Sequence, residues 1–127
     1  MESFTQLHIW RQGTELVKEI YTLTKKLPPE EKFGLTSQTR RAAVSILTNL
    51  AEGFSRRTAP DKAHKYTIAR GECSETAALL LIMVHLGYLS DVEIENALKL
   101  ADETGRLLSG LIHVHMDKDP TPHTLRP

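Results

Sequence analysis

Several features that constrain function are scarce in this chain of 127 residues. Cys73 is the one cysteine, so no internal disulfide can form, and a reducing compartment is expected. The longest apolar run, Ala77–Val84, is far shorter than the ~20 residues that a membrane-spanning helix needs. The N-terminus, MESFTQLHIW, lacks the basic and apolar segments of a secretory signal. These absences predict a cytoplasmic protein with no membrane role.

Sequence motifs of enzymes and metal sites are also missing. The chain has no phosphate loop, dinucleotide fingerprint, nucleophile elbow or zinc-ligand cluster. His113 and His115 are two residues apart, so on a helix they would point away from each other. The pairs that do have helical spacing are Asp61 with His64 and Glu72 with Glu75. Neither pair forms the ligand set that a di-iron bundle builds on two helices, so we predict no enzyme activity, no metal and no cofactor.

What the chain does contain is helical periodicity. Apolar residues recur every three or four positions in four segments, and no segment has the alternating pattern of a strand. We expect helices at about 6–27, 35–57, 60–86 and 91–116. The boundaries carry stop and start signals: Pro28-Pro29, Pro60, Gly87 and the capping box Ser90–Glu93. Short connections favour an all-α, antiparallel up-down-up-down four-helix bundle over residues 1–116, followed by a tail, 117–127, that we expect to be disordered.

Packing expectations follow from the same pattern. The inner stripe of the first helix is expected to run through Leu7, Trp10, Val17, Ile20, Tyr21, Thr24 and Leu27, widened by Ile9, Leu16 and Leu23. The second half of the third helix, TAALLLIMVHL, is apolar on nearly all sides, which favours burial against another subunit and hence a homo-oligomer. Gly105 and Gly110 weaken the fourth helix, so we expect another helix to approach closely at both positions.

The segment 35–57 is chemically distinctive because a polar line runs along it. Its members recur every three or four residues and share one helix face: Gln38, Arg41, Ser45, Asn49, Glu52 and Arg56. One interpretation is a site in which Arg41, Asn49 and Glu52 bind a phosphate, a base or a protein partner. The other is structural: Arg41 or Asn49 ties helices together, within one subunit or between subunits, for instance by pairing with Glu52 or Glu75. We prefer the structural interpretation, because buried polar groups need partners.

Positive charge is concentrated in the middle of the chain. Residues 40–70 hold seven basic and two acidic side chains, although the net charge of the whole chain is zero. This excess indicates either an ordinary solvated helix surface or a surface that binds an anion. The candidate nucleic-acid-binding residues are Arg40, Arg41, Arg56, Arg57, Lys62 and Lys65, whose cationic groups suit phosphate oxygens. Tyr66 could stack on a base, although a place in the core is the simpler expectation.

The sequence resembles a known family at several points. In the second helix the resemblance lies in Leu35, Ser37-Gln38, Arg41-Ala42-Ala43, Ser45-Ile46 and Asn49–Gly53. Elsewhere it lies in Leu7, Trp10, Phe33–Leu35, Tyr66, Ala69, Gly71, Glu75 and Leu86–Leu89. Over about residues 4–112 the chain is therefore similar to the four helix bundle protein family, also called the ribosomal RNA intervening-sequence protein family. Some of its members are encoded within insertions in bacterial large-subunit ribosomal RNA genes.

The resemblance carries expectations about fold and assembly. It implies a left-handed antiparallel bundle in a bacterial cytoplasm and a ring-shaped homo-oligomer, a pentamer. The polar residues of the family motif are Gln38, Arg41, Ser45, Asn49, Glu52 and Glu75. Related accessory proteins of diversity-generating retroelements are basic pentamers that bind nucleic acid and a reverse transcriptase. This chain differs from them because it is neutral overall.

Two functional hypotheses follow. The first is a non-catalytic homo-oligomeric scaffold that binds RNA or DNA through a basic surface on the second and third helices. With no base-recognition element in the sequence, such binding would be weakly sequence-specific. The alternative is a protein-interaction adaptor that presents the acidic fourth helix to a protein partner. The acidic residues of that helix are Asp91, Glu93, Glu95, Asp102 and Glu103.

Overall fold

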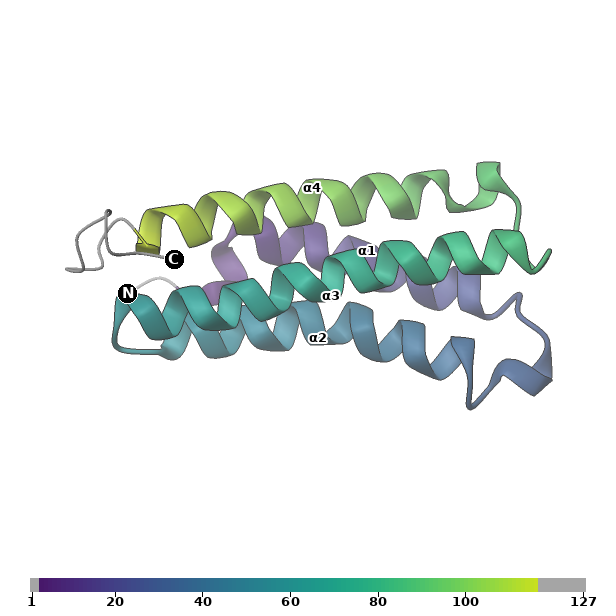
Figure 1. Cartoon of the computed structure of the whole chain (residues 1–127), viewed down its shortest axis with the longest axis horizontal. Helices are drawn as coiled ribbons and strands as arrows, with labels where there is room; N and C mark the ends of the chain where they lie inside the picture. The colour runs from purple at the N-terminus through teal and green to yellow at the C-terminus, as the bar shows by residue number, and fades with distance from the viewer. Residues whose placement is uncertain (1–2, 117–127) are drawn as a thin grey trace.

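Four long helices arranged as a bundle make up the computed structural model, which describes residues 3–116 (Figure 1). They are α1 (His8–Thr24), α2 (Leu35–Ser55), α3 (Ala59–His85) and α4 (Asp91–Met116). Two short 3₁₀ turns, η1 (Phe4–Gln6) and η2 (Pro29–Glu31), precede α1 and α2. Each helix packs against its two neighbours in the order α1, α2, α3, α4, and α4 closes the bundle against α1. Residues 3–116 contain no strand, so the predicted all-α four-helix bundle is confirmed.

The two ends of the bundle differ in what they bring together. The turn between α2 and α3, the start of α1 and the end of α4 lie at one end, and the other two connections lie at the opposite end (Figure 1). At that opposite end Tyr88 Oη donates a hydrogen bond to Glu31 Oε2 at 2.9 Å, which joins the α3–α4 connection to the α1–α2 connection. No helix in residues 3–116 combines the length and the apolar character needed to cross a bilayer. The predicted disordered tail, 117–127, lies outside the described residues.

Local signals fixed most helix ends as predicted. Gly87 has a φ of +80°, which terminates α3 in the left-handed conformation that glycine adopts without strain. Ser90 Oγ accepts from the Glu93 amide at 3.1 Å, and Glu93 Oε1 accepts from the Ser90 amide at 3.0 Å, so the predicted capping box is present. The Thr58 hydroxyl caps α3 by accepting from the Asp61 amide at 3.2 Å.

Two predicted helices are too long. The first was expected to span 6–27, but Leu7 is extended (φ −71°, ψ 140°), because η1 forms separately on a Ser3 cap, and the regular helix ends at Thr24. The second was expected to reach residue 57 but ends at Ser55. Arg56 is extended, and Lys62 Nζ donates to the Phe54 carbonyl at 2.7 Å, satisfying one of the carbonyls left open by the helix end.

The core is apolar and its polar members are satisfied internally. The fully buried side chains include Leu16, Ile20, Ile46, Leu50, Tyr66, Leu80, Met83, Ile94 and Leu108. One buried threonine lies on each helix: Thr24, Thr39, Thr76 and Thr104. Each threonine hydroxyl donates to the carbonyl four residues earlier, at 2.6–2.8 Å, so the core needs no external hydrogen-bond partner at these positions.

The inner stripe of α1 is displaced from the one we predicted. Its buried residues are Ile9, Gly13, Leu16, Ile20, Leu23 and Thr24. Trp10 and Val17 are only half-buried at its edge, and Tyr21 is exposed. The apolar face of α1 is wide, so periodicity alone does not locate its centre. The packing of α2 and α4 against α1 determines which of its residues are buried.

The close helix approaches occur at glycines other than those predicted. A Cβ at Gly53 would lie 2.5 Å from Cε1 of the Tyr66 ring, and a Cβ at Gly13 would lie 2.5 Å from Cδ2 of Leu47. At Gly105 the nearest outside atom, Cys73 Cβ, would be at an ordinary 3.8 Å, and Gly110 has open space around it. The prediction for Gly110 is therefore wrong: its side of α4 faces away from the neighbouring helices.

We expect opposite effects from two alanine substitutions. Gly53→Ala should lower the free energy of unfolding by about 1–3 kcal/mol, because the added methyl group overlaps the ring of buried Tyr66. Gly110→Ala should raise it by roughly 0.5–1 kcal/mol, because alanine favours the helix and meets no neighbour. Urea titrations followed by circular dichroism measure both values. Equal effects of the two substitutions would show that the packing of Tyr66 on Gly53 is not tight.

Candidate nucleic-acid interface

The polar line on α2 forms a seam with α3. The Arg41 guanidinium donates to Glu72 Oε2 at 2.9 Å and also to Glu75 on the same helix, and Lys65 Nζ lies 2.8 Å from Glu52 Oε2. The hydrogen bond from Arg41 to Glu72 raises the pKa of Arg41, and the hydrogen bond from Lys65 lowers the pKa of Glu52. These pairs match the structural interpretation of the line, in which Arg41 ties two helices together.

The other members of the line do not cross to α3 in this way. Of the two candidates, Arg41 makes the pair with Glu75, whereas Asn49 Nδ2 donates to the Ser45 carbonyl at 2.9 Å and so bonds within α2. An asparagine amide on a helix reaches the carbonyl of the previous turn without any help from a neighbouring helix. Gln38 and Arg56, at the two ends of the line, are exposed.

The six predicted cations do not form one patch. Arg40 and Arg56 are sixteen positions apart in sequence, which is about 24 Å along a helix. Arg40 lies against Tyr21 of α1, whereas Arg41 and Lys65 are used in the seam with Glu72, Glu75 and Glu52. Arg56 and Arg57 are exposed and form no ion pair within residues 3–116.

We call Arg56, Arg57 and Lys62 the basic turn, because they lie where α2 passes into α3. An aromatic cluster supports this end of the bundle: the ring of Phe4 in η1 lies 5.0 Å from that of Trp10 and 6.5 Å from that of Phe54, measured between centroids. Lys62 Nζ lies 5.6 Å from the Phe54 ring centroid as well as bonding to the Phe54 carbonyl. The backbone of the basic turn is thus held in place while its two arginines face solvent.

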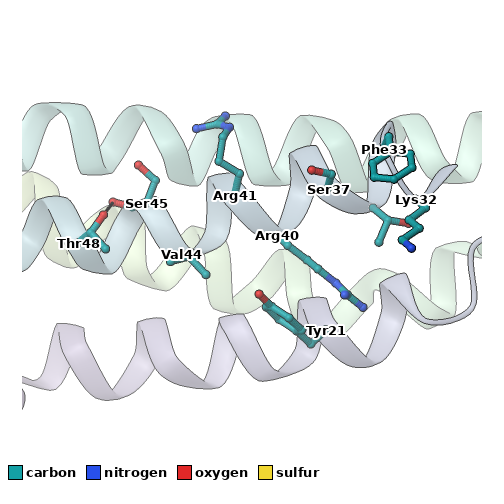
Figure 2. A pocket seen from close by; sticks show the side chains of 10 residues that line it. Tyr21, Lys32, Phe33, Ser37, Arg40, Arg41, Val44, Ser45 and Thr48 are labelled. Atoms are coloured by element: carbon teal, nitrogen blue, oxygen red, sulfur yellow. Dashed lines mark hydrogen bonds between the residues drawn. The ribbon is translucent and has the colours of Figure 1, made fainter.

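A second cationic surface, which was not predicted from the sequence, is a groove along the outside of α2. This α2 groove has a volume of about 730 Å³, and its lining includes Tyr21, Lys32, Phe33 and Arg40 (Figure 2). Figure 2 shows Arg40 pointing toward Tyr21, and Arg41 pointing away from it toward α3. The available signal was the Lys-Phe pair before Gly34, in a connection that has no apolar pattern to bury it.

Cys73 and Tyr66 are in structural positions. Burial raises the pKa of the Cys73 thiol to about 12, so it is protonated at neutral pH and is a poor nucleophile. Tyr66 is buried beside Gly53 and His115, and burial also raises its pKa. Among residues 3–116 no three histidine, cysteine or acidic side chains gather as a metal site would require.

The acidic side chains of α4 are largely engaged inside the chain. Glu93 pairs with Lys26 at 3.0 Å as well as capping α4, and the hydrogen bond from Lys26 lowers the pKa of Glu93. Asp102 pairs with Arg106 at 2.8 Å, and Glu103 accepts from Gln12 at 3.2 Å. Asp91 and Glu95 are exposed without an ion pair in the described part of the chain.

Comparisons with known proteins agree with the fold. A family model described as 23S rRNA-intervening sequence protein matches residues 5–110. A solved structure of a protein with unknown function from the S23 ribosomal protein family of Bacteroides thetaiotaomicron matches with a TM-score of 0.75 and 25% sequence identity. That match covers 82% of this chain and 97% of the other. No curated protein matches the chain.

Arg41 is expected to affect stability rather than binding. Arg41→Gln should lower the free energy of unfolding by about 1 kcal/mol, because Glu72, whose side chain is only 15% exposed, loses its partner. Lys18→Gln is the matched control: it breaks the exposed pair with Glu15 and should change stability by at most ~0.5 kcal/mol. Urea unfolding measures both. Unchanged stability of Arg41→Gln, together with loss of nucleic-acid binding, would favour the binding-site interpretation of the polar line.

Proposed function

The chain belongs to the 23S rRNA-intervening sequence protein family, and we propose that it is a non-catalytic, homo-oligomeric scaffold that binds RNA or DNA through the basic turn. The observation that carries the proposal is the exposure of Arg56 and Arg57, which have no ion-pair partner in residues 3–116, on a turn held by packed aromatic rings. Two guanidinium groups in this position bind phosphate oxygens with little loss of backbone entropy.

A non-catalytic role is supported by the positions of the reactive groups. Cys73 is buried and protonated, and Tyr66 belongs to the core. The ion pairs of Arg41 and Glu52 connect two helices and leave neither group free to transfer protons to a ligand.

The homo-oligomer is supported by exposed apolar side chains on α3. Ile82 and Leu86, at the C-terminal end and the C-cap of α3, are one turn apart and both exposed, and Ile68 lies on the same side of the helix fourteen residues before Ile82. Exposed apolar side chains that gather at one end of a helix are typical of a contact with another protein surface. We propose that this face packs against a second copy of the chain and that the copies close into a ring, a pentamer. The basic turn would then recur once per subunit, and weak phosphate contacts would add up.

The alternative, a protein-interaction adaptor without a nucleic-acid role, rests on the acidic residues of α4. Three of the five, Glu93, Asp102 and Glu103, already bind Lys26, Arg106 and Gln12. The free acidic surface is therefore smaller than the sequence suggests, and we place this function second.

Charge reversal at the basic turn tests nucleic-acid binding. In 50 mM salt, Arg56→Glu/Arg57→Glu should weaken binding of a single-stranded RNA by about tenfold or more and flatten its salt dependence. Lys18→Glu/Lys99→Glu makes the same change in net charge on α1 and α4 and should have a much smaller effect. Fluorescence anisotropy measures each affinity. Absence of binding by the unaltered protein at low salt would contradict the proposal and leave the adaptor as the better hypothesis.

Disruption of the α3 face tests the oligomer. Light scattering should give a mass about five times that of one chain for the unaltered protein, and Ile82→Asp should reduce it to one chain, since a buried unpaired carboxylate is costly. Val92→Asp is the control, because Val92 is an equally apolar, 78% exposed residue on α4 outside the α3 face. A single-chain mass for the unaltered protein would overturn the scaffold.

A further inference from the structure

Among residues 3–116, Phe33 is the most exposed large apolar side chain. It is 89% exposed, although burial of a phenylalanine ring stabilises a folded protein. The segment that carries it is fixed: Glu31 Oε1 accepts from the Leu35 amide at 3.1 Å, its Oε2 accepts from Tyr88, and the Gly34 amide donates to the Glu31 carbonyl at 3.0 Å. The ring is thus presented to solvent by an ordered turn.

Arg40 is held in the same groove in a position suited to an anion. Its Nε donates to the hydroxyl of buried Thr24 at 2.9 Å, and its guanidinium carbon lies 4.4 Å from the centroid of the Tyr21 ring. Within residues 3–116 its two terminal amino groups have no hydrogen bond or ion pair. This arrangement fixes a guanidinium fork that can donate two parallel hydrogen bonds to the oxygens of a phosphate.

The electrostatics of the α2 groove favour an anionic ligand. None of its lining residues is acidic, whereas the three smaller grooves described in the same part of the chain include Asp102, Glu15 or Glu95. Glu72 and Glu75 neutralise Arg41, so the net charge comes from Arg40 and from Lys32, whose Nζ lies 5.4 Å from the Phe33 ring centroid. Ser37, Ser45 and Thr48 add hydroxyl groups along the groove (Figure 2).

We propose that the α2 groove binds a single-stranded nucleic acid, with one base stacked on Phe33 and the neighbouring phosphates held by Lys32 and Arg40. An exposed aromatic ring beside unpaired cations fits this ligand, since every base offers a face for stacking and every nucleotide a phosphate. A duplex is a poorer fit, because its bases are already stacked on one another. The inference rests on the proposed nucleic-acid function and adds a base contact that the basic turn does not have.

The test compares two probes of equal charge. One is a labelled twelve-nucleotide oligodeoxyadenylate, and the other is a twelve-unit abasic strand with the same phosphates and no bases. The unaltered protein should bind the first about tenfold more tightly. Phe33→Ala should remove this preference and leave binding of the abasic strand unchanged. Arg40→Gln should weaken binding of both probes, and Arg40→Lys should restore only part of the loss, because lysine lacks the planar fork.

Val92→Ala is the matched control for Phe33→Ala, because it also removes a highly exposed apolar side chain, on α4, and should change neither affinity. Circular dichroism melting curves should coincide for these two variants and the unaltered protein. This keeps a binding defect separate from a folding defect.

Three other outcomes would contradict the proposed base site. Equal binding of both probes by the unaltered protein, weakened by Arg56→Glu/Arg57→Glu, would overturn the base site and leave the basic turn as the nucleic-acid surface. A Phe33→Ala variant that loses affinity equally for both probes would also overturn stacking. No binding of either probe at low salt would overturn the proposed function together with the base site, and a protein segment would then be the better occupant for the groove.

Discussion

The close contact between α2 and α3 is the constraint on which the rest of the structure depends. It is possible because Gly53 has no side chain where the ring of buried Tyr66 packs. With the two helices this near each other, the Arg41 guanidinium reaches two carboxylates on α3. The ion pairs between α2 and α3 therefore depend on the steric fit of the two helices. A larger residue at Gly53 would disturb the seam as well as the core.

The same contact decides which charges are available for binding. Residues 40–70 hold seven basic side chains. Arg41 and Lys65 form ion pairs in the seam between α2 and α3, and Lys62 donates to the Phe54 carbonyl at the end of α2. The four remaining cations lie at separate places: Arg56 and Arg57 at one end of α2, Arg40 near the other, and Arg70 exposed on α3. In the proposed ring, each subunit would carry two modest anion-binding surfaces in place of one strong patch. Affinity would then depend on how many are engaged at once.

The α2 groove and the basic turn both include residues of rigid connections between helices. Glu31 accepts three hydrogen bonds, from the Leu35 amide, the Tyr88 hydroxyl and, through its carbonyl, the Gly34 amide, so the α1–α2 connection is fixed where Phe33 protrudes. At the other end, the rings of Phe4, Trp10 and Phe54 support the basic turn. A side chain on an ordered turn loses less entropy on binding than one on a mobile loop.

The sequence alone determined the features whose causes are local. Four amphipathic periods, the Ser90–Glu93 capping box and the left-handed Gly87 depend on residues a few positions apart, so the bundle and the start of α4 could be predicted. Only the tertiary structure decided which polar groups pair, because Glu72 and Glu75 are 31 and 34 positions from Arg41 in the sequence. It also decided that Gly53, not Gly110, lies at a helix contact, and that Lys32, Phe33 and Arg40 share a groove. A period of 3.6 residues indicates that a helix has an inner face, but the neighbouring helices determine which residues that face contacts.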